Sequence, residues 1–153
     1  MKFLYPLIVF FVSIEAIILA GAIFIFLNFN LELKSMVDAS AINGDFAKYL
    51  MAIPIGLAVW VANECRLLLQ EDRQTIQLLT EWDGYSRMKV HVYVSVLYAV
   101  IFATISLIPW VTALGVSTAA GILSIATSIV GQLALAGSVY FARIRSKEIL
   151  SKV

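Results

Sequence analysis

The sequence predicts an all-α polytopic membrane protein that folds as a bundle of four transmembrane helices. Of its 153 residues, 61% are apolar and only 14% are charged, whereas charged residues make up about 25% of a typical soluble domain. The apolar residues gather in four blocks, each close to the roughly 20 residues that a helix needs to cross a bilayer. Only short pieces remain between the blocks, so we expect a single domain over residues 1–153.

The first span is expected over residues 4–27, where Lys2 precedes a long apolar run. Residues 20–22 have the small-residue form of a signal-peptidase site, but Glu15 interrupts the run before them and the run continues after them. A cleaved signal peptide has a shorter apolar region that ends at its cleavage site. We therefore predict an uncleaved helix, followed by a loop over residues 28–48.

Three further spans are expected over residues 49–69, 90–111 and 118–141. Pro54 lies within the outer turns of the second span, where it can bend the helix. Pro109 and Trp110 mark the far end of the third span, where a proline stop and an aromatic anchor are typical. Only a short turn then precedes the fourth span.

The distribution of Lys and Arg predicts which ends of the spans face the cytoplasm. Two of these cations, Lys34 and Lys48, flank one side of the predicted spans. The other side holds Lys2, Arg66, Arg73, Arg87, Lys89, Arg143, Arg145, Lys147 and Lys152. Because cytoplasmic loops are enriched in Lys and Arg, we expect both termini and the connection between the second and third spans to be cytoplasmic. The expected location is a cell membrane, specifically a bacterial inner membrane.

Small residues form one continuous stripe along the fourth span. They recur at spacings of three and four, which places them on one face of a helix: Ala120, Ser124, Thr127, Gly131, Ala134 and Ser138. Small side chains let a second membrane helix approach closely, and hydroxyls can hydrogen-bond across the contact. Three uses of this stripe stay open: packing within the bundle, contact between copies of the chain, and lining of a polar pore.

Glu15 is an acid near the middle of the first span. A charged carboxylate there costs about 2.5 to 3.5 kcal/mol on insertion scales, so we expect Glu15 to be neutral at pH 7. Counting about 1.5 Å per residue from the cytoplasmic ends places Glu15 and Gln132 at similar depths, roughly 17 and 14 Å. We expect the acid to be mainly a hydrogen-bond partner of Gln132, with proton or ion handling as the alternative.

A second polar group, near the cytoplasmic end of the second span, comprises Asn63, Glu64 and Arg66. Glu64 and Arg66 are two residues apart and therefore do not face each other on a helix. We expect Arg66 to extend toward the lipid headgroups. Glu64 then needs a cation from another helix, and Lys89 and His91 are the candidates nearest in depth.

The connection over residues 70–89 is predicted to extend the second and third spans as a cytoplasmic helical hairpin. An upright hairpin exposes four large side chains at or near its tip: Leu79, Trp82, Tyr85 and Met88. Residues 70–83 carry four acids and one Arg, which favours a protein partner over anionic lipid. The tip is therefore predicted to bind a cytoplasmic protein, with a plain connector between two spans as the alternative.

The residues give no support for catalysis, a cofactor or a metal site. Cys65 and His91 are the only cysteine and histidine, whereas a metal site needs three or four converging ligands, and no nucleophile–base constellation is present. A transporter is disfavoured because no paired broken helices are predicted, and the balanced charge gives no case for nucleic acid.

We expect a non-enzymatic membrane subunit, embedded in the lipid bilayer, that forms a homo-oligomer with four copies as the working number. It would anchor, scaffold or signal to a cytoplasmic protein partner, as small four-span proteins do in bacterial envelope, immunity and phage-defence complexes. The alternative is a small oligomeric ion channel or pore, because Ser124, Thr127, Ser128 and Gln132 could line one.

Overall fold

The computed structural model describes residues 4–40, 44–69, 85–112, 115 and 118–150. Within them it contains the helices α1 (Leu4–Phe11), α2 (Ile14–Ser40), α3 (Gly44–Leu69), α5 (Tyr85–Val111) and α6 (Ala119–Leu150). Four stretches are long and apolar enough to cross a membrane: Ile14–Asp38, Tyr49–Leu69, Ser86–Val111 and Ala119–Glu148. The prediction of an all-α membrane bundle with four spans is therefore confirmed.

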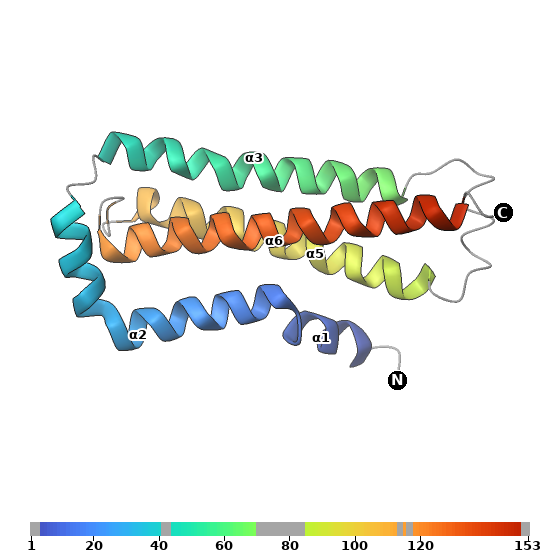
Figure 1. Ribbon diagram of the computed structural model, residues 1–153, viewed down its shortest axis with the longest axis horizontal. Coiled ribbons are helices and arrows are strands. Elements are labelled where there is room, and N and C mark those ends of the chain that lie inside the picture. Colours follow the sequence, from blue (N-terminus) through green and yellow to red (C-terminus); the bar gives the residue numbers. More distant parts are fainter. Residues whose placement is uncertain (1–3, 41–43, 70–84, 113–114, 116–117, 151–153) are drawn as a thin grey trace.

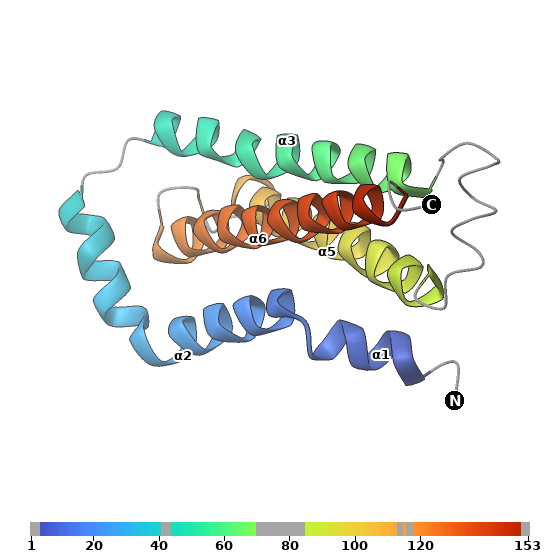
Figure 2. The same ribbon diagram turned by 45° about the vertical axis from the view of Figure 1, so that its right-hand side comes forward.

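Helix α6 lies at the centre of the bundle and contacts α2, α3 and α5 (Figures 1 and 2). Helices α1 and α3 both pack on α5. The start of α1, the end of α3, the start of α5 and the end of α6 lie together at one end of the bundle. We refer to this end, which holds Leu4 and Leu150, as the terminal end.

The core lies between α3, α5 and α6. Its buried residues are Val61, Cys65 and Leu68 of α3, Val92, Tyr98, Ala99 and Phe102 of α5, and Leu135 and Val139 of α6. Helix α2 stands at the edge of this core, because Glu15 is the one buried residue in the stretch 14–38 of α2. Since lipid is as apolar as a leucine side chain, helices in a membrane associate through close packing and hydrogen bonds.

The first predicted span consists of two helices, so the prediction of one continuous helix over residues 4–27 was wrong. Helix α1 ends at Phe11 and α2 begins at Ile14. Ser13 caps α2, because its hydroxyl accepts a hydrogen bond from the backbone N–H of Ala16 (3.2 Å). An acid in the first turn, Glu15, also favours a helix start at this position. We refer to the interruption at residues 12–13 as the helix break.

The loop predicted over residues 28–48 is largely helical. Helix α2 continues to Ser40 through a kink at Phe29, whose φ of −121° and ψ of 20° are not helical. After the kink, α2 turns across the end of the bundle opposite the terminal end, toward the start of α3 (Figures 1 and 2). Asn28 stands directly before the kink, and its side chain donates to the Phe24 carbonyl one turn earlier (2.9 Å).

The third span extends as a helix at the terminal end, as predicted, and the fourth span extends farther there than predicted. Helix α5 begins at Tyr85 rather than at Val90, and α6 continues to Leu150 rather than ending at Phe141. The helical extension predicted for the third span is therefore present from Tyr85 onward. The first part of the predicted hairpin, residues 70–84, lies outside the described residues.

Candidate functional site

The helix break is held by hydrogen bonds from Tyr98 of α5 and from Ser13 within the break itself. In a continuous helix the Phe10 carbonyl accepts a hydrogen bond from the residue four positions later. Here it accepts one from the hydroxyl of Tyr98 on α5 (2.6 Å) and one from Ser13 (3.2 Å). The Tyr98 ring also stacks on Phe10, with the ring centroids 4.6 Å apart. This backbone carbonyl at the break is therefore satisfied inside the bundle, as a membrane requires.

Replacing Tyr98 by Phe should lower the free energy of unfolding by about 1 to 2 kcal/mol. The substitution removes the hydrogen bond to the Phe10 carbonyl but keeps the stacked ring. Unfolding of the purified protein in mixed micelles measures the change. Tyr93→Phe is the matched control, because Tyr93 lies on the exposed face of the same helix. Equal stability of the two variants would mean that the Tyr98 hydroxyl does not hold the break.

Gln132 does not make the hydrogen bond to Glu15 that its depth suggested. Its Nε2 instead donates to the backbone carbonyl of Ala99 on α5 (2.7 Å). Gln132 is fully buried, and its Oε1 is the one buried side-chain polar atom without a partner in the described part of the chain. Depth counting places two groups at one level but does not show which neighbouring helix each group faces. Gln132 therefore links α6 to α5 and keeps an unpartnered acceptor.

The small stripe of α6 faces different neighbours along its length. Gly131 lies against α5, because a Cβ built on it would overlap three atoms of the Phe102 ring. Nearer the start of α6, Ala120, Ser124 and Thr127 face α2 across a cavity. Toward the terminal end, Ala134 is half-buried, and Ser138 is exposed but lines a small pocket that also includes His91.

The most buried face of α6 lies beside this stripe. It is formed by the residues that directly follow the six stripe positions: Gly121, Ile125, Ser128, Gln132, Leu135 and Val139. The stripe is thus the flank of the buried face. Side-chain size matters on this flank because α5 and α2 approach α6 there.

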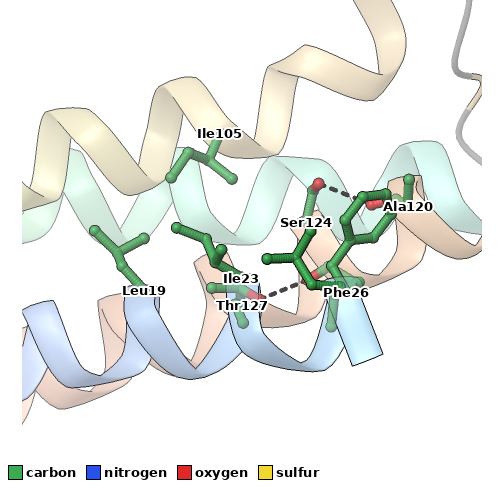
Figure 3. A pocket seen from close by; sticks show the side chains of 10 residues that line it. Leu19, Ile23, Phe26, Ile105, Ala120, Ser124 and Thr127 are labelled. Atoms are coloured by element: carbon green, nitrogen blue, oxygen red, sulfur yellow. Dashed lines mark hydrogen bonds between the residues drawn. The ribbon is translucent and has the colours of Figure 1, made fainter. Parts of the chain in front are cut away.

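The cavity between α2, α5 and α6 has a volume of about 340 Å³ (Figure 3). Its walls are Leu19, Ala22, Ile23, Phe26 and Leu27 of α2, Ile105 of α5, and Ala120, Leu123, Ser124 and Thr127 of α6. The two hydroxyls in the wall are turned back to their own helix. Ser124 donates to the Ala120 carbonyl (2.8 Å), and Thr127 donates to the Leu123 carbonyl (2.7 Å). Sequence reasoning missed this cavity, because residue spacing does not show how far α2 stands from α5.

Glu64 takes its cation from α6, and the cation is Arg143 rather than Lys89 or His91. The Arg143 guanidinium donates to Glu64 Oε2 at 2.5 Å. The Glu64 side chain is 10% exposed and that of Arg143 is 38% exposed. Because α6 stays helical beyond Phe141, it carries Arg143 alongside the end of α3. Asn63 and Arg66 lie on the exposed side of α3.

His91 and Met88 make contacts within the bundle at the terminal end. His91 Nε2 lies 3.3 Å from the Tyr5 hydroxyl of α1, and the two rings meet edge to face. Met88, which was expected to be exposed, is half-buried and accepts a hydrogen bond from Ser146 (3.4 Å). The correction follows from α6, whose extension covers one side of Met88. Leu79 and Trp82 lie outside the described residues.

Comparisons of the chain with protein-family models, with curated proteins and with solved structures gave no match. Among the described residues, no group of three or more His, Cys, Asp or Glu side chains is placed to hold a metal ion. The geometry described above leaves two candidate sites. One is the cavity with the nearby helix break and Glu15, and the other is the terminal end of α3, α5 and α6.

Proposed function

We propose that this protein is a non-enzymatic membrane subunit that anchors a cytoplasmic protein partner and forms a homo-oligomer. The main support is the length of the helices at the terminal end. Helix α6 has 32 residues, which correspond to about 48 Å at 1.5 Å per residue, whereas the hydrocarbon core of a bilayer is about 30 Å thick. A helix of this length projects beyond the core and offers a surface outside the membrane.

The projecting part of α6 is packed against its neighbours. Ser146 is buried and bonds to Met88 of α5, and Arg143 pairs with Glu64 of α3. Three helices therefore reach the terminal end as one unit. Binding surfaces held on rigid helices are more precisely placed than those on loops, so this end suits the support of a partner.

The charges at the terminal end support its cytoplasmic placement. Residues 61–69, 85–91 and 141–150 carry cations at Arg66, Arg87, Lys89, Arg143, Arg145 and Lys147, against acids at Glu64 and Glu148. Such a basic end is attracted to the anionic headgroups of the cytoplasmic leaflet. The intervening residues 70–83 are acidic and are repelled by the same surface. We therefore place the partner on the acidic connection and expect it to be basic.

A pore through a single chain receives no support from the packing. Tyr98, Phe102 and Leu135 are fully buried in the middle of the bundle, and the Ser124 and Thr127 hydroxyls donate to their own helix. A pore would have to form between copies. Part of the small stripe of α6 already faces α5 and α2 within one chain, so we propose that copies meet on the outward face of α2, which exposes Ile17 and Phe24.

Changing Leu79→Asp together with Trp82→Ala should abolish partner recovery and leave membrane insertion intact. A few large side chains contribute most of the binding energy at protein interfaces. Trp82→Ala removes one such side chain, and Leu79→Asp replaces another with a charged carboxylate. The measurement is quantitative co-purification of the tagged full-length protein from its own cells. The paired changes Gln74→Ala and Gln77→Ala, at polar positions of the same segment, are the matched control.

Full partner recovery by the Leu79/Trp82 variant would defeat the docking proposal. The same outcome would make conductance of the purified protein in planar bilayers the next measurement, because the channel alternative would then be preferred.

A further inference from the structure

The polar groups in the wall of the cavity can only accept hydrogen bonds. Eight of its ten lining residues are apolar. The remaining two, Ser124 and Thr127, donate their hydroxyl hydrogens to carbonyls of α6 and present only oxygen lone pairs to other groups (Figure 3). A ligand with an apolar body fits such walls, and any polar group that it places there must be a donor.

Glu15 lies on the cavity face of α2, one turn beyond the last lining residue. Glu15, Leu19, Ala22 and Phe26 follow spacings of 4, 3 and 4 and therefore share one side of the helix. On α6, which runs antiparallel to α2 (Figure 1), the stripe continues from Thr127 to Gly131 over the same distance. Glu15 is thus a buried acid one turn beyond Leu19, on the side of the cavity toward the terminal end.

The other polar groups at this level are also acceptors. Gln132 Oε1 is buried and unpartnered. The hydroxyls of Tyr98 and Ser128 donate to the carbonyls of Phe10 and Ser124. The Tyr98 and Ser128 hydroxyls therefore have no hydrogen left to donate, and the Gln132 amide keeps one N–H beyond the one that it donates to Ala99.

Cations of the neighbouring helices lie far from Glu15. The stretch 4–33, which contains α1 and the first part of α2, has no Lys or Arg. On α6 the first titratable groups after Ala119 are Tyr140 and Arg143 near the terminal end, and Arg143 is paired with Glu64. On α5 the titratable group at this depth is Tyr98. A carboxylate inside a membrane pairs with a cation when one is supplied, and here no described neighbouring group supplies it.

We propose that the cavity binds a lipophilic amine, with the apolar body in the cavity and the ammonium group on the Glu15 carboxylate. The ammonium group of the bound amine and the Glu15 carboxylate would form an ion pair inside the bundle. The cavity volume of about 340 Å³ falls within the range of about 300 to 1,000 Å³ for small-molecule pockets. This site is independent of the partner surface at the terminal end.

Three probes of equal chain length test the proposal: octylamine, 1-octanol and octanoate. Each is titrated into the full-length protein in phosphatidylcholine nanodiscs, and saturable binding is measured by native mass spectrometry together with the midpoint of thermal unfolding. Octylamine should bind saturably and raise the midpoint. 1-Octanol, which has a donor but no charge, should bind about tenfold or more weakly, and octanoate, which has no donor, should not bind. Glu15→Gln should weaken octylamine binding by about tenfold or more, which corresponds to at least 1.4 kcal/mol.

Two further variants separate the cavity from the acid. Ala22→Phe fills the cavity and should abolish octylamine binding, whereas Ala126→Phe, on an exposed position of α6, should leave it unchanged. Equal saturable binding of 1-octanol and octylamine, or full octylamine binding by a folded Glu15→Gln protein, would overturn the proposal. If Glu15→Gln does not fold, octylamine binding by a folded Ala22→Phe protein would overturn it instead.

Discussion

Gly131→Ala is expected to lower the free energy of unfolding by roughly 1 to 3 kcal/mol, the usual cost of overpacking a core, and Gly131→Leu is expected to prevent assembly of the bundle. A Cβ at this position overlaps the Phe102 ring. Phe102 is fully buried and packs against Tyr98, with the ring centroids 6.1 Å apart, so the ring has no open space to enter. Helix α6 must then move away from α5.

Gly137→Ala is the matched control for this substitution. Gly137 lies on the same helix, and a Cβ there meets nothing within 4 Å. Because Ala is the better helix former by about 1 kcal/mol, this variant should be as stable as the parent or slightly more stable. Adding Phe102→Leu to Gly131→Ala should recover part of the loss. Thermal and denaturant unfolding in micelles measure all four proteins, and equal stability of the two glycine variants would refute the close contact.

Arg143→Ala is expected to destabilise the protein by roughly 2 to 3 kcal/mol, because it leaves the Glu64 carboxylate inside the bundle without its cation. The loss should stay below the 3 to 5 kcal/mol range of fully buried pairs, since the Arg143 side chain is 38% exposed and partly solvated. Changing both residues to Leu should cost much less than Arg143→Ala alone, because no charge then remains to be compensated.

A double-mutant cycle at Glu64 and Arg143 measures this coupling. Arg145→Ala is the control, because Arg145 is exposed on the same helix and a surface cation contributes little to stability. The contact contributes no coupling energy if the double variant loses as much free energy of unfolding as the two single variants lose together.

The sequence predicted the number and type of the spans because apolar length is a strong signal in a membrane protein. The helix break was missed although its signal is present. Ser13 followed by Glu15 is a recognisable helix start, but the unbroken apolar run on both sides favoured one continuous helix. The kink at Phe29 was missed in a different way, because Asn28 suggested a loop and instead bonds within the helix.

The candidate sites could be predicted only in part. The sequence shows how deep in the membrane a residue of a span lies, but it does not show which neighbouring helix its side chain faces. Depth correctly placed Glu64 at a level where another helix supplies a cation, but it did not single out Arg143 on the extended α6. Depth likewise brought Gln132 level with Glu15, yet Gln132 donates to the Ala99 carbonyl of α5 instead. The cavity depends on the separation of three helices, which no local pattern contains.

The helix break also determines how the first span is rotated about its own axis. Phe11, Val12, Ile14 and Ile17 are all mostly exposed, so apolar side chains surround the span and give it little preference for one inward face. The unbonded amides and carbonyls of an interrupted helix cannot face hydrocarbon, and they must turn toward α5 and α6. The orientation of this span is thus encoded in its main chain, and it should persist through apolar exchanges at its surface but not through insertion of a residue at the break.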